Sequence, residues 1–189
     1  MIKIGNNVTI TPGVTILTHD YSWSVIAVYD NCILGSVGQV HIGDNVFIGQ
    51  NTTILAGTTI GNNVIIGANS LVKKDIPDNV VVAGNPVKIV CTLDEFIEKR
   101  KIRYVKETKE MAKLYYEKYK IWPDKELFYE NFWIFENEYT HLEPYFQDVF
   151  NWTQCDKEKM LDKFNTHKKI IDSYEKLIEI CKQEIKKEE

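Results

Sequence analysis

Aliphatic residues recur at every sixth position through the N-terminal half of the chain. The longest unbroken run is Ile42, Ile48, Ile54, Ile60, Ile66 and Val72. A second series of apolar or small residues lies four positions further along: Val46, Thr52, Thr58, Val64, Ser70 and Ile76. The same phase occurs earlier at Ile4, Ile10 and Ile16. A period of six fits neither the 3.6-residue turn of an α-helix nor the alternation of a hairpin strand, so it predicts short β-segments joined by tight turns.

Three such hexads would close one triangular coil of a parallel β-helix. Each aliphatic residue then points inward and stacks on its counterpart in the next coil, while Gly, Asn and Asp occupy the turns. An antiparallel sandwich is the alternative for a chain rich in Val and Ile. Sandwich strands would vary in spacing, whereas the register here does not slip between Ile42 and Val72. The pattern therefore favours the β-helix, although the period alone does not determine its handedness.

The composition changes near residue 91. All 10 glycines lie at or before Gly84, and residues 1–91 contain no glutamate. The remainder is rich in Lys, Glu and aromatic residues, as expected for helices with large apolar faces. We therefore predict a β-helix domain over residues 1–91 and a helical region over residues 92–189.

Within the helical region, Thr92 and Glu95 form a capping-box pattern that predicts a helix running to about Tyr119. A shorter helix is expected from Lys125 to about Phe135. Apolar residues from Met160 to Ile185 alternate in steps of four and three, which favours one helix docked within the subunit over a free coiled coil. The aromatic segment FYENFWIF is expected to be core that covers the open end of the β-helix, with a position beside a sugar site as the alternative.

Charge and cysteine content narrow the possible partners. The formal net charge is −4, so a nucleic-acid partner is not expected. The chain has no signal-peptide pattern and no apolar run near the roughly 18 residues that span a bilayer, which predicts a cytoplasmic protein without a membrane span. The four cysteines are far apart without CxxC spacing, so we expect neither a disulfide nor a zinc knuckle.

One step of the repeat is greatly lengthened. The interval from Ile16 to Ile42 is 26 residues instead of six, and it forms a loop over residues 17–41. A loop of this length in a tightly wound repeat is more often functional than accidental. His19 stands near its start, where the β-helix still holds the backbone while the side chain is free to point outward. A lone histidine is usually structural, so the residues alone leave the role of His19 open between a structural residue and a catalytic base.

Three motifs together resemble a known family: the IG-x-N/D-x-V-x-IG hexads, the THD in the loop, and the closing KKDIPDNVVVAGNPVK. They look like the hexapeptide-repeat, left-handed β-helix acyltransferases, and most resemble saccharide O-acetyltransferases and xenobiotic (streptogramin-type) acetyltransferases. The resemblance covers about residues 1–92. It implies a left-handed parallel β-helix, acetyl-CoA as cosubstrate, no metal, and a homotrimer with active sites at subunit boundaries.

The resemblance also implies site residues. His19 matches the catalytic base of the family, which would remove the proton of an acceptor hydroxyl without a covalent intermediate. The acceptor would lie near Asp20, Tyr21, Trp23 and Phe47; Phe47 stands where many sugar acetyltransferases carry tryptophan. Asp20 could orient His19, bind the acceptor or simply be solvated. Coenzyme A would contact backbone amides near Ala56 and Ala68, the side chains of Lys73, Lys74 and Lys88, and Pro86.

Several alternatives remain beside this interpretation. A covalent route through Cys32 is disfavoured because Asp30 would raise the pKa of the thiol. His41 is a second candidate base, although a surface role is expected. A zinc-dependent carbonic anhydrase would need three converging histidines, and only His19 and His41 occur in the repeats. A non-enzymatic trimeric scaffold would not need the His-containing loop. The acceptor stays open between a capsule or O-antigen sugar, which we expect, and an antibiotic.

Overall fold

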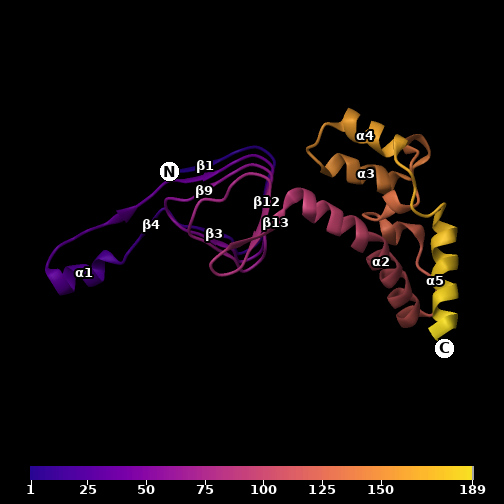
Figure 1. Cartoon of the computed structure of the whole chain (residues 1–189), viewed down its shortest axis with the longest axis horizontal. Coiled ribbons are helices and arrows are strands. Elements are labelled where there is room, and N and C mark those ends of the chain that lie inside the picture. Colours follow the sequence, from indigo (N-terminus) through magenta and orange to yellow (C-terminus); the bar gives the residue numbers. More distant parts are fainter. Residues whose placement is uncertain (189) are drawn as a thin grey trace. The chain divides into compact units, whose positions relative to one another are not determined.

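The computed structural model describes residues 1–188. The chain forms two compact units, Met1–Lys99 and Arg100–Glu189. The first unit is a coil of short strands, and the second is helical (Figure 1).

Short parallel strands build the three faces of the first unit. Face A contains β1 (Ile2–Ile4), β6 (Val40–Ile42) and β9 (Thr59–Ile60). Face B contains β2 (Val8–Ile10), β7 (Val46–Ile48), β10 (Val64–Ile66) and β12 (Val80–Ala83). Face C contains β3 (Thr15–Ile16), β8 (Thr53–Ile54) and β11 (Leu71–Val72). β13 (Lys88–Thr92) pairs with β12 antiparallel and ends the β-helix.

The register stacks the aliphatic series into columns. Ile10 pairs with Ile48, and Ile48 pairs with Ile66. The residues of the unbroken run are at most 3% exposed. The predicted parallel β-helix and its core are therefore confirmed. The polar members of the second series are also buried, and Thr58 and Ser70 each donate a hydroxyl hydrogen bond to a carbonyl oxygen three residues earlier. Burial of these hydroxyls is tolerated because they are hydrogen-bonded.

One corner of the coil carries a ladder of asparagines. Asn7, Asn45, Asn63 and Asn79 all have φ values between 53° and 59°, a left-handed region that Asn enters more easily than most residues. The carboxamides of Asn7, Asn45 and Asn63 each donate to the carboxamide oxygen of the asparagine in the next coil, at 2.8–2.9 Å. The ladder thus connects successive turns through side chains as well as backbone.

The last coil is shorter than the repeat predicts. Ile42 and Ile60 are partners 18 residues apart, but the next partner of Ile60 is Ile76, only 16 residues on. The turn Lys73–Asp75 is contracted, so Ile76 enters the strand position of face A. Its assignment to the second series of the repeat was therefore wrong, although the regular register up to Val72 is confirmed.

The helical unit is entered through α2 (Leu93–Tyr119). The capping box at its start is present: the backbone N–H of Thr92 donates to the Glu95 carboxylate at 3.0 Å, and the N–H of Glu95 donates to Thr92 Oγ1 at 3.2 Å. These bonds satisfy amides that have no partner within the helix. The predicted start and end of this helix are confirmed.

The remaining elements depart from the predictions. The expected helix after Lys125 consists of two 3₁₀ turns, η1 (Lys125–Phe128) and η2 (Phe132–Ile134), and η3 (Tyr139–His141) follows. The expected single helix from Met160 is two helices, α4 (Lys157–Thr166) and α5 (Tyr174–Glu188), after α3 (Pro144–Trp152). At His167 both ring nitrogens lie against carbonyl oxygens, those of Phe164 at 2.5 Å and Trp133 at 2.8 Å. These contacts hold the chain in an extended turn where the apolar alternation predicted a continuous helix.

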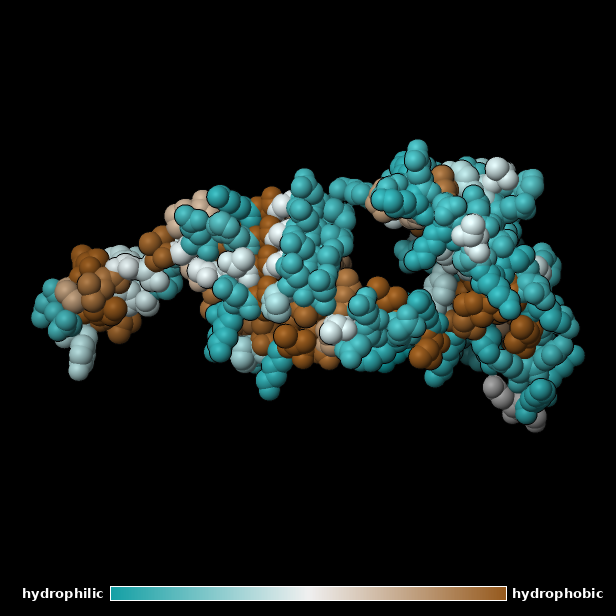
Figure 2. Space-filling model, turned by 45° about the horizontal axis from the view of Figure 1, so that its top comes forward, coloured by the Kyte–Doolittle hydropathy of each residue, from teal (hydrophilic) through white to brown (hydrophobic). Residues whose placement is uncertain are grey.

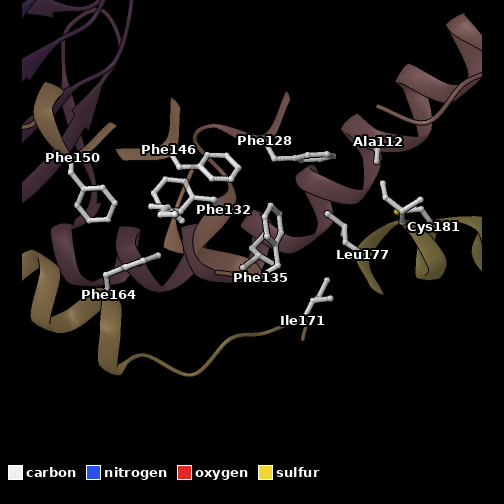
Figure 3. Close-up of a cluster of buried hydrophobic side chains, with 13 residues drawn as sticks. Ala112, Phe128, Phe132, Phe135, Phe146, Phe150, Phe164, Ile171, Leu177 and Cys181 are labelled. Carbon is white, nitrogen blue, oxygen red and sulfur yellow. The ribbon is translucent and has the colours of Figure 1, made fainter. Parts of the chain in front are cut away.

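Aromatic side chains form the core of the helical unit (Figure 3). Phe132 packs on Phe146 and Phe164, with ring centroids 4.8 and 5.5 Å apart. Leu177 and Cys181 of α5 are fully buried in the same cluster, so the expected docking of this helix within the chain is confirmed. The phenylalanines of FYENFWIF lie in this core, so the expectation that this segment is core is confirmed, and its place over the end of the β-helix stays a prediction. Among residues 1–188, no helix is long and apolar enough to cross a membrane.

Candidate active site

The lengthened loop forms an arm over residues 17–39. β4 (His19–Asp20) pairs antiparallel with β5 (Ser36–Val37), and α1 (Trp23–Asp30) lies between them. The arm extends away from the coils at the corner between faces C and A (Figure 1). Its base is fixed there by backbone hydrogen bonds, since Leu17 N–H donates to Ile54 O at 2.9 Å and Gly57 N–H donates to Gln39 O at 3.1 Å.

His19 occupies the rigid base of this arm. Its backbone pairs with Val37 in the two-stranded sheet, and its side chain is exposed. Asp20 beside it is engaged elsewhere, because its Oδ1 accepts from Ser22 N–H at 2.9 Å and from the Ser22 hydroxyl at 2.5 Å. These hydrogen bonds hold the pKa of Asp20 below its usual value, with a smaller contribution from His19. These contacts place Asp20 in a turn that leads into α1.

The rest of the arm presents apolar surface to solvent. Tyr21 is 69% exposed, and its ring lies 4.5 Å from that of Trp23. α1 has no buried residue. Large apolar side chains are exposed along the arm, namely Val25, Val28, Tyr29, Ile33, Leu34 and Val37, and Figure 2 shows hydrophobic atoms gathered at this end of the molecule. Contiguous exposed apolar surface of this kind marks an interaction site in soluble proteins.

The residues expected to bind coenzyme A occupy three places on the β-helix. Ala56, Lys73 and Lys74 lie in the turns stacked at the corner where the arm leaves, since Leu55 N–H donates to Val72 O. Ala68 lies at the corner between faces B and C. Pro86, preceded by a cis peptide bond, and Lys88 follow β12. The structure therefore places His19 at the same corner as Ala56 and the paired lysines.

Two backbone amides at these corners are available to a ligand. Within residues 1–188, the N–H groups of Ala56 and Ala68 donate to no protein acceptor. The pairing pattern equates Ala68 with Gln50 and with Pro12, since Asn69 N–H donates to Gln50 O and Asn51 N–H donates to Pro12 O. A proline at the equivalent position has no N–H to donate. The coil thus does not use this amide for its own stability.

Phe47 lies on another surface. It is 42% exposed and lines a groove of about 250 Å³ on face B, together with Thr9, Ile65 and three asparagines of the ladder. Face B lies opposite the corner that carries the arm, so one chain does not bring Phe47 and His19 together. Thr9 and Ile65 are the register partners of Phe47. Sequence reasoning missed both, although their place between inward-pointing residues of the hexads marks them as outward-facing.

Cys32 and His41, the alternative nucleophile and the alternative base, each contact a nearby polar side chain. The Cys32 thiol donates to the Asp30 carboxylate at 3.3 Å, and this bond raises the pKa of Cys32, as expected from the sequence. His41 on β6 is partly buried and lies 3.0 Å from Gln39 Oε1. In the part of the chain that the structure describes, no group of three or more His, Cys, Asp or Glu side chains is placed to hold a metal ion.

Comparison with known proteins identifies the repeat region. Residues 39–74 match the family "Bacterial transferase hexapeptide (six repeats)". The prediction of a hexapeptide-repeat transferase is thereby confirmed for this segment, and with it the left-handed form of the parallel β-helix.

Relatives match about half of the chain. Protein CapG of Staphylococcus aureus is 47% identical over 97 residues, which are 51% of this chain and 55% of CapG. Galactoside O-acetyltransferase of Escherichia coli is 39% identical over 99 residues, 50% of this chain and 45% of the enzyme. The chain thus spans about half the length of the curated relatives it matches.

Solved structures overlap over a similar share. A galactoside acetyltransferase in complex with coenzyme A is 38% identical, with a TM-score of 0.44, over 49% of this chain and 45% of that chain. A maltose O-acetyltransferase from Clostridium difficile 630 is 43% identical, with a TM-score of 0.44, over 49% of this chain and 48% of that chain.

Proposed function

We propose that the protein is an acetyl-CoA-dependent O-acetyltransferase that modifies a hydroxyl group of a saccharide, with His19 as the general base. The observation that carries the proposal is the placement of His19 at the fixed base of the arm, on the corner that also presents the free amide of Ala56 and the side chains of Lys73 and Lys74. The sequence similarity to a galactoside O-acetyltransferase supports the reaction class.

The residues present suit coenzyme A. The lysines at the corner supply positive charge for its phosphates, and the unused amides of Ala56 and Ala68 can bind carbonyl oxygens along its extended arm. When bound, acetyl-CoA would supply the acetyl group as a thioester.

The chemistry at His19 is a proton transfer in two directions. The neutral imidazole takes the proton of the acceptor hydroxyl as its oxygen attacks the acetyl carbonyl. The carbon–sulfur bond then breaks, and the imidazolium returns the proton to the leaving sulfur. A free backbone N–H can stabilise the transient oxyanion. No covalent bond to the protein is needed, which agrees with the raised pKa of Cys32.

We further propose a homotrimer with its sites at the subunit boundaries. One chain separates His19 from the Phe47 groove, and it leaves the apolar side chains of the arm uncovered. Association that places the arm of one subunit beside the faces of another would cover this surface and assemble a complete site.

An assay of acetyl-CoA turnover with sugar, nucleotide-sugar and streptogramin acceptors tests the assignment. The release of free thiol measures the turnover. Replacement of His19 by alanine should lower turnover by about 10²–10⁴ and leave coenzyme binding nearly unchanged, because the base acts on the acceptor. His41→Ala is the matched control, since His41 is the other histidine of the repeats. His41→Ala and Cys32→Ala should both stay close to the unaltered protein. Full turnover by the His19 variant would refute the assignment.

Subunit mixing tests the shared site. A His19→Ala variant and a Phe47→Arg variant should each be inactive as pure proteins. If the two residues meet across a boundary, exchange of subunits restores part of the activity, since some boundaries then carry both native residues. If each subunit builds its own site, mixing restores no activity, and the proposal that the site lies at a subunit boundary is wrong.

A further inference from the structure

The helical unit contains a groove that acetyl transfer does not explain. It has a volume of about 270 Å³ and is lined by Glu126, Tyr129, Tyr145, Asp148 and Trp152. Three of these residues are aromatic and two are acidic, and the lining contains no basic residue.

The sequence of α3 produces one wall of the groove. Phe146 and Phe150 point into the core and are at most 3% exposed. Tyr145, Asp148 and Trp152 are spaced by three and four residues, so they share the opposite, outward face of the helix. An outward helix face is ordinarily polar. Here two aromatic residues flank a carboxylate on that face, and aromatic residues are enriched at binding surfaces.

The aromatic rings are open to solvent. Trp152 is 64% exposed and Tyr129 is 41% exposed, and their rings meet at 6.0 Å with an angle of 73° between the planes. Two rings at this angle form adjacent walls. Burial raises the pKa of Tyr145, and the negative charge of Glu143 raises it further. The phenol therefore remains neutral at physiological pH. Aromatic faces carry negative electrostatic potential and attract cations.

The carboxylates add uncompensated negative charge. Within residues 1–188, Glu126 and Asp148 form no hydrogen bond or ion pair through their side chains. Trp152 is the last residue of α3, and the last turn of this helix contains no basic residue. The C-terminal end of a helix bears partial negative charge, which favours a cation at this end of the groove. Rings, carboxylates and helix end therefore all select positive charge.

We propose that this groove binds an organic ammonium group, such as the trimethylammonium of choline or the amine of an amino sugar. The rings contact the carbon substituents of the ammonium, and the carboxylates of Glu126 and Asp148 balance its charge. A neutral sugar would use the rings but would leave both charges unpaired. The proposal does not depend on acetyl transfer, so each can fail without the other.

Isothermal titration of the full-length protein with choline chloride tests the site. A dissociation constant of about 1 mM is expected for a ligand of this size. The uncharged isostere 3,3-dimethylbutan-1-ol should bind at least tenfold more weakly, because it retains the shape without the charge. Trp152→Ala should weaken choline binding about tenfold or more, while Trp152→Phe keeps an aromatic face and most of the affinity. Tyr119→Ala removes an aromatic residue of similar exposure outside the groove and should change nothing.

A charge variant keeps the test independent of packing. Asp148 is exposed, so Asp148→Asn should leave the fold intact, weaken choline binding severalfold and reduce its dependence on salt. Glucosamine compared with choline distinguishes the two sources of the ammonium group, and N-acetylglucosamine is the neutral control. The proposal is overturned if the neutral isostere or N-acetylglucosamine binds as tightly as the charged ligands. Absence of ammonium binding at tens of millimolar would overturn it equally.

Discussion

Neighbouring coils approach closely at Gly49, and this contact yields a stability prediction. A Cβ atom at this position would lie 2.5 Å from the backbone nitrogen of Ala68 and 2.8 Å from the carbonyl carbon of Gly67. Both atoms belong to the backbone of the next coil, which cannot rotate away as a side chain could. Gly57 offers the contrast, since a Cβ there meets nothing within 4 Å but its φ is +81°.

The expected magnitudes follow from these two geometries. Contacts to carbon atoms are normally about 3.5 Å, so Gly49→Ala creates an overlap of about 1 Å with the backbone nitrogen of Ala68, which the neighbouring coils must relieve by moving apart. Because strand spacing in a sheet is held near 4.8 Å by hydrogen bonds, we expect a loss of about 3 kcal/mol in the free energy of unfolding. Gly57→Ala meets only the strain of a left-handed φ, about 1 kcal/mol, which is partly offset by a less flexible unfolded chain.

Amide hydrogen exchange read by mass spectrometry measures this difference locally. Peptides covering residues 46–54 should exchange much faster in Gly49→Ala than in Gly57→Ala. Peptides from α5 provide an internal control, since they belong to the other compact unit. Equal protection in the two variants would show that contact between coils does not limit stability at this corner.

Two further predictions concern the core of the β-helix and an ion pair of the helical unit. Ile66→Ala should cost 2–5 kcal/mol (order of magnitude) in denaturant unfolding, because Ile66 is 0% exposed, whereas Val25→Ala in the arm should be nearly neutral in a single chain. Lys109 and Lys113 lie 2.5 and 2.8 Å from the Glu184 carboxylate and hold its pKa below the usual value. This ion pair should therefore stabilise the helical unit above about pH 4.3 and be lost as the pH falls through the folded pKa. Glu184→Gln should remove that part of the pH dependence, about 1 kcal/mol or less because the side chain is one-third exposed.

The β-helix was predictable because its signal is strictly local and repeated. Each inward residue of the run from Ile42 to Val72 faces the same environment, so the six-residue period reports the fold directly. The slip at Ile76 was not predictable from that period, since nothing in the apolar pattern distinguishes a contracted turn from a regular one.

The helical unit was harder to predict for a different reason. Its first helix was predicted from a local signal, the capping box of Thr92 and Glu95. The break at His167 depends on carbonyl oxygens of Trp133 and Phe164 that only the tertiary fold brings together. The geometry of the candidate site likewise depends on the tertiary fold. The sequence indicated His19 and Phe47, but it could not show that they lie on different sides of the coil.

The arm interrupts the chain without disturbing the winding of the coil. Thr15 and Ile16 before it pair with Thr53 and Ile54 in the same register that Thr53 and Ile54 keep with Leu71 and Val72. Since each strand is positioned by the coil beneath it, the corner tolerates inserted residues of almost any number. The arm can then change in length and sequence while the coils on either side keep their register. Because the coil keeps its register across the insertion, this corner is a suitable place to graft new loops.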